Sequence, residues 1–227
     1  AKGLSQVTLR LTYARASHEE EASFVDSIRT AEQLKAAYAA ILRMILPRAK
    51  DMVERETTIR NAAKRAVFPY NEMRDAQKDM ILECWRDMRA GKTLFAEAPT
   101  GIGKTIATLY PAVRLFGEGK CDKIFYLTAK NATRREAFGA VKKLTETGTS
   151  VRACVITARE SACLCETAKS GGNRLSSYCN PDTCPYAKGY YDKVESVLWD
   201  MMESGKSIFS GLDIRAAAQK WQVCPYE

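Results

Sequence analysis

The sequence predicts an α/β fold in which helices cover a parallel β-sheet. Short apolar segments at 93–98, 123–128 and 151–157 have the length and composition of buried strands. A glycine-rich turn and a helix that starts at Lys104 separate the first two, and a polar-faced helix over 131–147 separates the last two. Strands that alternate with helices at this spacing are typical of a parallel sheet.

The N-terminal part of the chain lacks this alternation. Residues 4–14 alternate apolar and polar side chains, which predicts a strand. Apolar residues at helical spacing predict one helix over 31–46, interrupted by Pro47, and a second over 50–66. The basic residues of the second helix fit a solvated face better than a nucleic-acid site, because charged residues usually occupy the exposed side of a helix. We find no catalytic motif in this region.

Composition narrows the function classes. The chain has 227 residues, 46% of them apolar, and a net charge of +8, which favours a polyanionic partner. No run of about 18 apolar residues and no secretory signal is visible, so we expect a cytoplasmic protein without a membrane span. The chain begins at Ala1 without a methionine and ends abruptly at Glu227, which suggests a piece of a longer protein.

A phosphate-binding loop is predicted between the first strand and its helix. The segment Ala98–Thr105 matches the P-loop pattern, with alanine at the first glycine position. Gly101 and Gly103 allow backbone N–H groups to approach a phosphate, and the following helix presents its positive N-terminal end. We expect Lys104 to reach the β- and γ-phosphates and Thr105 to hold Mg²⁺, which makes these two the predicted catalytic residues. The expected ATP contacts of the loop are Ala98, Pro99, Thr100, Gly101, Ile102, Gly103, Lys104, Thr105 and Ile106.

Hydrolysis needs more than this loop. An acidic residue must bind Mg²⁺ and another residue must orient the attacking water. Glu97 lies on the strand that enters the loop, and no apolar strand ending in paired acids follows. We therefore expect the hydrolytic half of the site to lie beyond Glu227, and the chain alone to be inactive as an ATP hydrolase.

The cysteines form a second pattern. Of the eight, six fall between residues 154 and 224, and the single histidine, His18, lies far away. Disulfides belong to oxidising compartments, whereas clustered cysteines beside an ATP site more often bind a metal. By spacing, the candidates for four ligands are Cys163, Cys165, Cys179, Cys184 and Cys224. Four thiolates suit either Zn²⁺ or a [4Fe–4S] cluster, so spacing alone leaves the metal open.

The other three cysteines have a simpler interpretation. Cys154 lies among Val151, Val155 and Ile156 in a predicted strand, and Cys84 and Cys121 have no cysteine nearby in the sequence. We expect all three to be small buried apolar residues.

From about Phe68 to Glu227 the chain resembles the iron–sulfur superfamily-2 DNA helicases of the XPD/DinG type. The order of several short motifs supports this resemblance. Phe68-Pro69-Tyr70, with Arg74 and Gln77, resembles the adenine-recognition motif of the family. Residues 97–105 resemble its motif I, and residues 126–130 resemble its motif Ia. Residues 157–164 resemble the start of its cluster domain, and residues 184–189 and 224–226 resemble the later ligand segments.

The resemblance implies a fold, cofactors and sites. It implies a RecA-like first motor domain over 67–157, an iron–sulfur cluster domain over 158–227 and an N-terminal, mainly helical connector over 1–66. The implied cofactors are ATP, Mg²⁺ and a [4Fe–4S] cluster. The implied cluster ligands are Cys163, Cys179, Cys184 and Cys224, with Cys165 as a spare. The implied adenine-site residues are Tyr70, Arg74 and Gln77, and the implied DNA-binding residues are Thr128, Lys130 and Arg159.

The resemblance also implies an activity for the parent protein: ATP-driven 5′-to-3′ movement along single-stranded DNA, with unwinding of forked duplexes. The implied partners are that DNA and a second motor domain of the same polypeptide, and DNA repair is one compatible pathway. Two features depart from the family, because the DEAH-type motif II and the second motor domain are absent from these residues, and residues 1–66 do not resemble the motor. Two alternatives therefore stay open: a P-loop ATPase with a Cys₄ zinc nucleic-acid-binding module, or a non-catalytic fragment that binds ATP and DNA.

Overall fold

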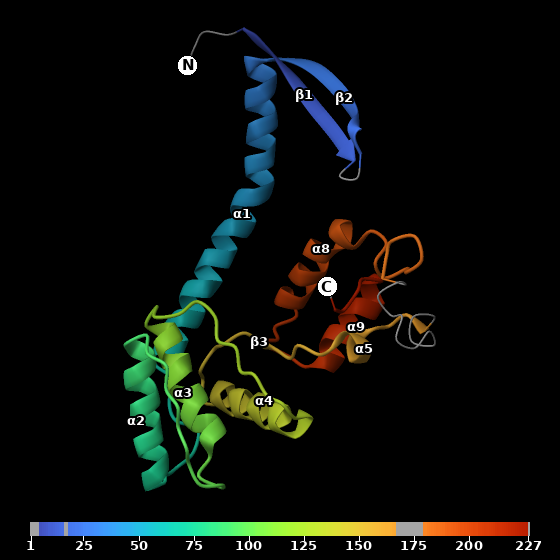
Figure 1. Ribbon diagram of the computed structural model, residues 1–227. Helices are drawn as coiled ribbons and strands as arrows, with labels where there is room; N and C mark the ends of the chain where they lie inside the picture. Colours follow the sequence, from blue (N-terminus) through green and yellow to red (C-terminus); the bar gives the residue numbers. More distant parts are fainter. Residues whose placement is uncertain (1–4, 16–17, 167–178, 227) are drawn as a thin grey trace. The chain divides into compact units, whose positions relative to one another are not determined.

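The computed structural model describes residues 5–15, 18–166 and 179–226 (Figure 1). The chain divides into two compact units, residues 1–56 and 57–227. The boundary lies inside the long helix α1, Ala31–Lys64, so the last turns of that helix belong to the second unit.

The first unit contains a two-stranded antiparallel sheet. Strand β1, Gln6–Arg15, confirms the strand expected over 4–14, and it pairs with β2, His18–Thr30, which the sequence did not predict. The register places Arg10 opposite Asp26, and the Arg10 guanidinium donates two hydrogen bonds to the Asp26 carboxylate, at 2.8 and 2.7 Å. This contact lowers the pKa of Asp26 and raises that of Arg10. The charged run of residues 19–21 interrupts the apolar–polar alternation by which β2 would have been found.

Helix α1 corrects one prediction. The sequence indicated two helices separated by Pro47, whereas the structure has one helix that passes through this proline. A proline removes a single backbone N–H donor and crowds the carbonyl four residues before it, so the helix loses one hydrogen bond while the turns on either side keep theirs.

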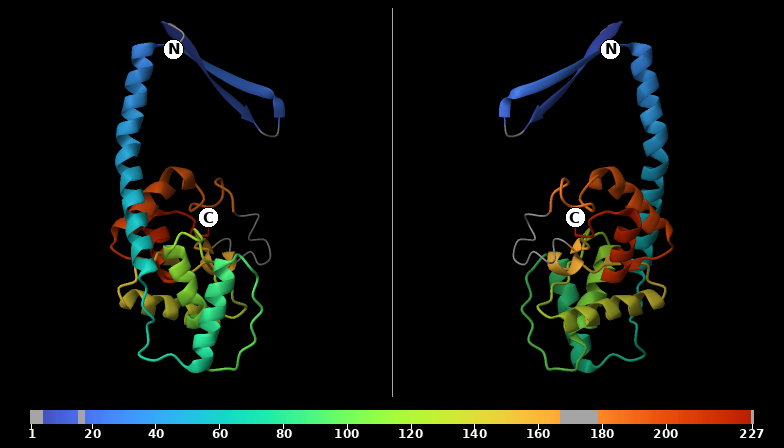
Figure 2. Two further views of the ribbon diagram at one scale, coloured as in Figure 1. Left: turned by 90° about the vertical axis from the view of Figure 1, so that its left-hand side faces the viewer. Right: turned by 90° about the vertical axis from the view of Figure 1, so that its right-hand side faces the viewer.

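Three helices near the phosphate loop form the main core of the second unit. Helices α3 (Lys104–Gly117) and α4 (Asn131–Glu146) confirm the two helices predicted between the apolar segments. Helix α2 (Asp75–Arg89) lies beside α3 in the turned views of Figure 2. Their apolar faces meet the end of α1 and the segment that follows it. Buried members of this core include Ala63, Phe68, Ile81, Ile106, Leu109, Val113, Ala137, Leu144 and Val151.

The predicted parallel sheet is largely absent from the described residues. Of the three predicted strands, only the one over 151–157 contains paired residues in the part that the structure describes. These residues form β3, Ala153–Cys154, which runs parallel to β4, Ile208–Phe209. Segments 93–98 and 123–128 are not strands, and their apolar side chains face solvent, with Phe95 94% and Leu127 87% exposed. The physical reason is that a strand is defined by its neighbours, and the residues that the structure describes supply none for these two segments.

The C-terminal part of the second unit has its own smaller core. It contains the short helix α5, Arg159–Ala162, and the longer helices α8, Tyr190–Glu203, and α9, Gly211–Trp221. The buried apolar residues between them are Leu164, Val197, Ala218 and Val223.

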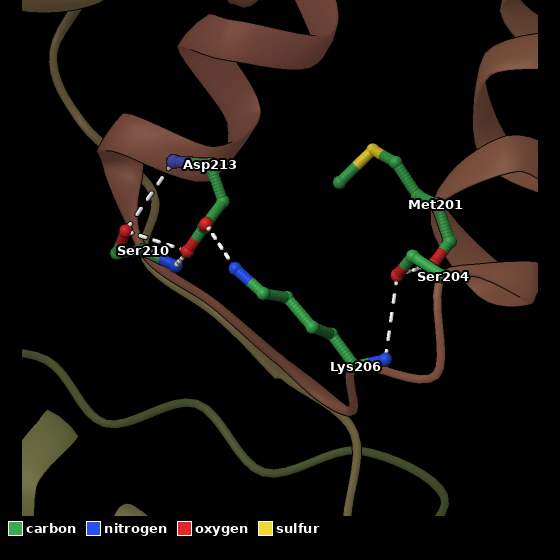
Figure 3. A network of polar contacts seen from close by, with 5 residues as sticks. All are labelled: Met201, Ser204, Lys206, Ser210 and Asp213. Atoms are coloured by element: carbon green, nitrogen blue, oxygen red, sulfur yellow. Dashed lines mark hydrogen bonds and ion pairs between the residues drawn. The ribbon is translucent and has the colours of Figure 1, made fainter.

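Polar contacts fix the turn between α8 and α9 (Figure 3). Ser210 caps α9: its hydroxyl accepts from the backbone N–H of Asp213, and the Asp213 carboxylate accepts from the backbone N–H of Ser210 at 2.9 Å. The Lys206 ammonium lies 2.7 Å from the same carboxylate. Lys206, followed by the Ser210 donors, lowers the pKa of Asp213 to about 2.

Candidate functional site: the nucleotide loop and the thiol group

The predicted phosphate loop lies directly before α3. Two of its glycines adopt left-handed backbone conformations, with φ of +84° at Gly101 and +82° at Gly103, which residues with side chains rarely tolerate. Gly103 is the residue that caps α3, so the loop delivers the free N–H groups of the helix N-terminus to the position expected for a phosphate.

The predicted catalytic lysine is held by the loop itself. The Lys104 ammonium donates to the carbonyl oxygens of Ala98, at 2.7 Å, and Pro99, at 2.9 Å. A bound phosphate would attract this ammonium more strongly than two neutral carbonyls, since charge-assisted hydrogen bonds are the stronger ones. Thr105 is half-buried in the first turn of α3, whereas the side chain of Ile106 is buried in the main core, which leaves its backbone N–H as the group that could meet a ligand.

Two residues from the start of α2 contact the loop, although they precede it by more than twenty positions. The Arg74 guanidinium donates to the carbonyl of Gly101, and the Gln77 amide donates to the carbonyl of Gly103 at 3.4 Å. Gln77 is buried, and a methyl group added at Gly103 would collide with its amide. The structure therefore brings Arg74 and Gln77 to the phosphate loop, where adenine recognition would require them.

Tyr70, the third predicted adenine-site residue, is partly exposed and packs against one aromatic neighbour, Phe68. Its ring centroid lies 5.7 Å from that of buried Phe68, which in turn meets Tyr110 edge-on at 5.5 Å. The ammonium of Lys143, on α4, lies 4.5 Å from the Tyr70 ring centroid. Sequence reasoning missed Lys143, because 73 positions separate it from Tyr70 and no local pattern links them.

The predicted DNA-binding residues lie in two places. Thr128 and Lys130 lie together just before α4, where the Thr128 hydroxyl donates to the Lys130 carbonyl at 3.3 Å and the Lys130 side chain is exposed. Arg159 lies on α5, and its guanidinium is 4.7 Å from the ring centroid of Tyr226. A side-chain hydrogen bond to Tyr226 is the first cause of the raised pKa of Arg159.

Five cysteines gather around α5 and the segments that follow it. Cys163, Cys165 and Cys184 are buried against one another, with Tyr186 packed beside them. Cys224 is half-buried and Cys179 is exposed. Within the described ranges, no three His, Cys, Asp or Glu side chains converge on one metal-ion position. The thiols thus have the donor chemistry of a metal group without the arrangement of a single-ion site.

The pKa values of the thiols reflect this gathering. Burial raises the pKa of Cys179; Arg159 opposes that rise, and the thiols of Cys163, Cys165 and Cys224 add to it. Burial also raises the pKa of Cys184, while backbone hydrogen bonds from Ala187 and Tyr186 oppose the rise and the Cys165 thiol adds to it. Cys179 and Cys184 therefore each lie close enough to other thiols of this group for their pKa values to respond.

The three remaining cysteines differ from one another. Cys84 is buried, as predicted, and burial raises the pKa of its thiol. Cys121 is only half-buried. The prediction for Cys154 is wrong, because its side chain is exposed: β3 is two residues long, and with only β4 beside it no sheet covers this position.

Part of this chain is similar to known helicases. The model of the DEAD/DEAH box helicase family matches residues 75–170, which include the predicted phosphate loop and α2 to α5. Helicase domains of this family have a RecA-like α/β fold, so this segment is similar to such a domain. A Methanocaldococcus jannaschii protein named "Probable ATP-dependent helicase" is 26% identical over 169 residues, which are 63% of this chain and 26% of that protein. The chain thus spans about a quarter of the length of this relative. No solved structure matches the chain.

In the part of the chain that the structure describes, no helix is long and apolar enough to cross a membrane.

Proposed function

We propose that this chain is the ATP-binding and single-stranded-DNA-binding front part of a 5′-to-3′ DNA helicase of the iron–sulfur XPD/DinG type. The observation that supports this most is the contact of Arg74 and Gln77 with the carbonyls of Gly101 and Gly103, because it joins the two side chains proposed to recognise adenine to the proposed phosphate loop. All four residues lie at or within one residue of the segment that the helicase family matches. The Gln77 amide can donate to and accept from adenine, which would favour ATP over GTP.

Nucleotide binding is the part of the proposal to test first. Lys104→Ala should weaken ATP binding about ten- to a hundredfold, because a hydrogen bond to a charged group contributes about 1.5–3 kcal/mol. Lys92→Ala, which removes an exposed lysine outside the loop, is the matched control and should bind ATP like the parent chain. Calorimetric titration with Mg²⁺–ATP measures both. Unchanged affinity in Lys104→Ala would show that the loop is not a phosphate site.

We also propose that these residues bind ATP without turning it over. Glu97 is exposed on the segment that enters the loop, where it would not serve as the Mg²⁺-binding acid. No apolar segment ending in paired acidic residues follows the loop in this sequence. A steady-state assay with single-stranded DNA should show negligible phosphate release. Robust DNA-stimulated turnover by the 227-residue chain would place the catalytic acid within it and contradict this part of the proposal.

The remainder of the sheet is proposed to come from further strands of the same polypeptide. The exposed apolar side chains of Phe95, Phe125 and Leu127 support this, because adjacent segments of such composition pair and become buried in α/β domains. The relative, which is about four times longer than the matched segment, has room for such strands and for a second motor domain.

DNA binding is proposed for the loop before α4. Thr128 and Lys130 lie where free backbone N–H groups of a helix N-terminus favour anions, and the +8 net charge attracts a polyanion. Affinity for single-stranded DNA should fall with salt, with a slope of about 0.7 per phosphate contact. Lys130→Ala should reduce this slope by about that amount.

A [4Fe–4S] cluster is proposed as the structural centre of residues 158–226, held by Cys163, Cys179, Cys184 and Cys224. The gathering of thiols supports it, because thiolates are the ligands that such clusters bind. Bound metal would tie α5 to the two later cysteine segments, where apolar burial is small.

The metal analysis decides between this cluster and its alternative. Iron, zinc and acid-labile sulfide are measured on the chain purified without oxygen. Iron with matching sulfide is the expected result. One zinc without sulfide would keep the nucleotide site but replace the iron–sulfur type by a P-loop ATPase with a zinc module.

A further inference from the structure

Cys165 lies inside the thiol group that the four proposed ligands form. It is 7% exposed, as is Cys184, whereas the proposed ligand Cys179 is exposed and Cys224 is half-buried. A thiol that served only as a small apolar residue would resemble Cys84, which is buried on α2 and lies outside the thiol group.

Two contacts join Cys165 to proposed ligands. The thiol of Cys163 lies 3.8 Å from the backbone carbonyl of Cys165, and the two residues follow each other on one buried segment. Cys165 and Cys184 also belong to one buried cluster with Cys163, so their side chains pack in the same small space. Cys165 therefore lies in the same cluster as the thiol that Cys184 would offer as a ligand.

We propose that Cys165 is a reserve ligand of this metal site, able to take the place of Cys184 when that thiol is lost or oxidised. A buried thiol already beside the vacant position needs little rearrangement, and it offers the soft thiolate donor that iron and zinc both accept. This inference rests on the proposed metal site, and it assigns a role to the fifth cysteine that the four-ligand set leaves without one.

Four variants of the whole chain test the reserve role: Cys184→Ala, Cys165→Ala, Cys165→Ala with Cys184→Ala, and Cys154→Ala with Cys184→Ala. Alanine is used because a serine oxygen can itself bind a metal. The last variant is the matched control, since it also lacks two thiols but keeps Cys165, and Cys154 is exposed and outside the group. Bound iron, zinc and sulfide per chain and the visible absorption spectrum are measured, with circular dichroism to follow folding.

Cys184→Ala and the matched control should each keep at least about half of the metal of the parent chain, while Cys165→Ala/Cys184→Ala keeps less than about a tenth, as expected when a site drops from four available thiolates to three. Cys165→Ala alone should keep the full content with an unchanged spectrum.

Three results would overturn the inference. Metal loss in Cys184→Ala as complete as in the Cys165→Ala/Cys184→Ala variant would show that Cys165 does not replace Cys184. Metal loss in Cys165→Ala alone would make Cys165 an obligate ligand. A parent chain without bound metal would remove the proposed metal site and this inference together, and because that result is read before any variant is made, the two failures are distinguishable.

Discussion

The two parts of the second unit are stabilised in different ways. Residues 57–151 pack α2, α3 and α4 around one extended apolar core. The described residues of 158–226 have a smaller apolar core, a thiol group and a network of polar contacts. The first kind of stability is spread over many side chains and follows helical periodicity. The second depends on a few specific contacts, so single changes there should act through charge, capping or metal rather than through lost apolar burial.

The largest effect is expected in the apolar core. Leu144, on α4, is fully buried, and Leu144→Ala should lower the free energy of unfolding by about 2–5 kcal/mol, through lost burial and the cavity that remains. Leu127→Ala is the control, because the Leu127 side chain is 87% exposed. Urea unfolding followed by circular dichroism measures both. Equal losses in the two variants would mean that Leu127 is as well buried as Leu144, contrary to the exposure described above.

A smaller effect is expected where α3 meets the end of α1. A methyl group at Gly117 would collide with the backbone of Ala63 and Lys64, so Gly117→Ala should cost about 1–3 kcal/mol as the helices move apart. Gly139→Ala adds the same methyl group to α4, where nothing lies within 4 Å, and should instead stabilise by about 0.5–1 kcal/mol. Opposite signs in thermal unfolding are the expected outcome, and equal signs would argue against the close contact.

The smallest effect is expected in the polar network before α9. Asp213→Asn removes the charge that Lys206 and Ser210 contact, and should cost about 1 kcal/mol at neutral pH, as expected for a helix cap. The pKa of Asp213 is lowered from 3.8 to about 2 in the fold, so its contribution is fully present above about pH 4 and is lost as the pH falls toward 2.

Unfolding experiments at pH 7 and at pH 2 to 4 measure this difference, with the exposed Asp79→Asn as control. The stability gap between the parent chain and Asp213→Asn should close over the acidic range, while the Asp79→Asn gap stays small throughout. A gap that persisted at pH 2 would show that the Asp213 charge is not what stabilises the turn.

Much of the nucleotide site was predictable from sequence, because its signals are local. The glycine spacing of residues 101–103, the lysine that follows and the helix after it form one continuous segment, and the structure has α3 begin at Lys104. Arg74 and Gln77 were also named in advance, by resemblance. Their contacts with the loop and the position of Lys143 on Tyr70 were not predictable, because these join segments far apart in the chain.

Arg60 is another residue whose contacts could not be predicted from the sequence, because its partners lie far away in the chain. Sequence reasoning placed it with the basic residues of a solvated helix face, whereas its guanidinium donates to the carbonyls of Phe116 and Cys121 and to the carboxylate of Asp122. Helical periodicity reports which side of a helix a residue occupies, but it does not report which distant loop passes that side.

The sequence by itself predicted α3 and α4, the strand β1, the glycine-rich loop before α3 and a cysteine-rich segment, because each depends on residues close together in the chain. Only the tertiary structure decided that α1 continues through Pro47, that segments 93–98 and 123–128 stay unpaired, and that Cys165 is buried beside Cys184 while Cys154 is exposed. These outcomes depend on which segments become neighbours, and that is set by packing between residues remote in sequence rather than by any local pattern.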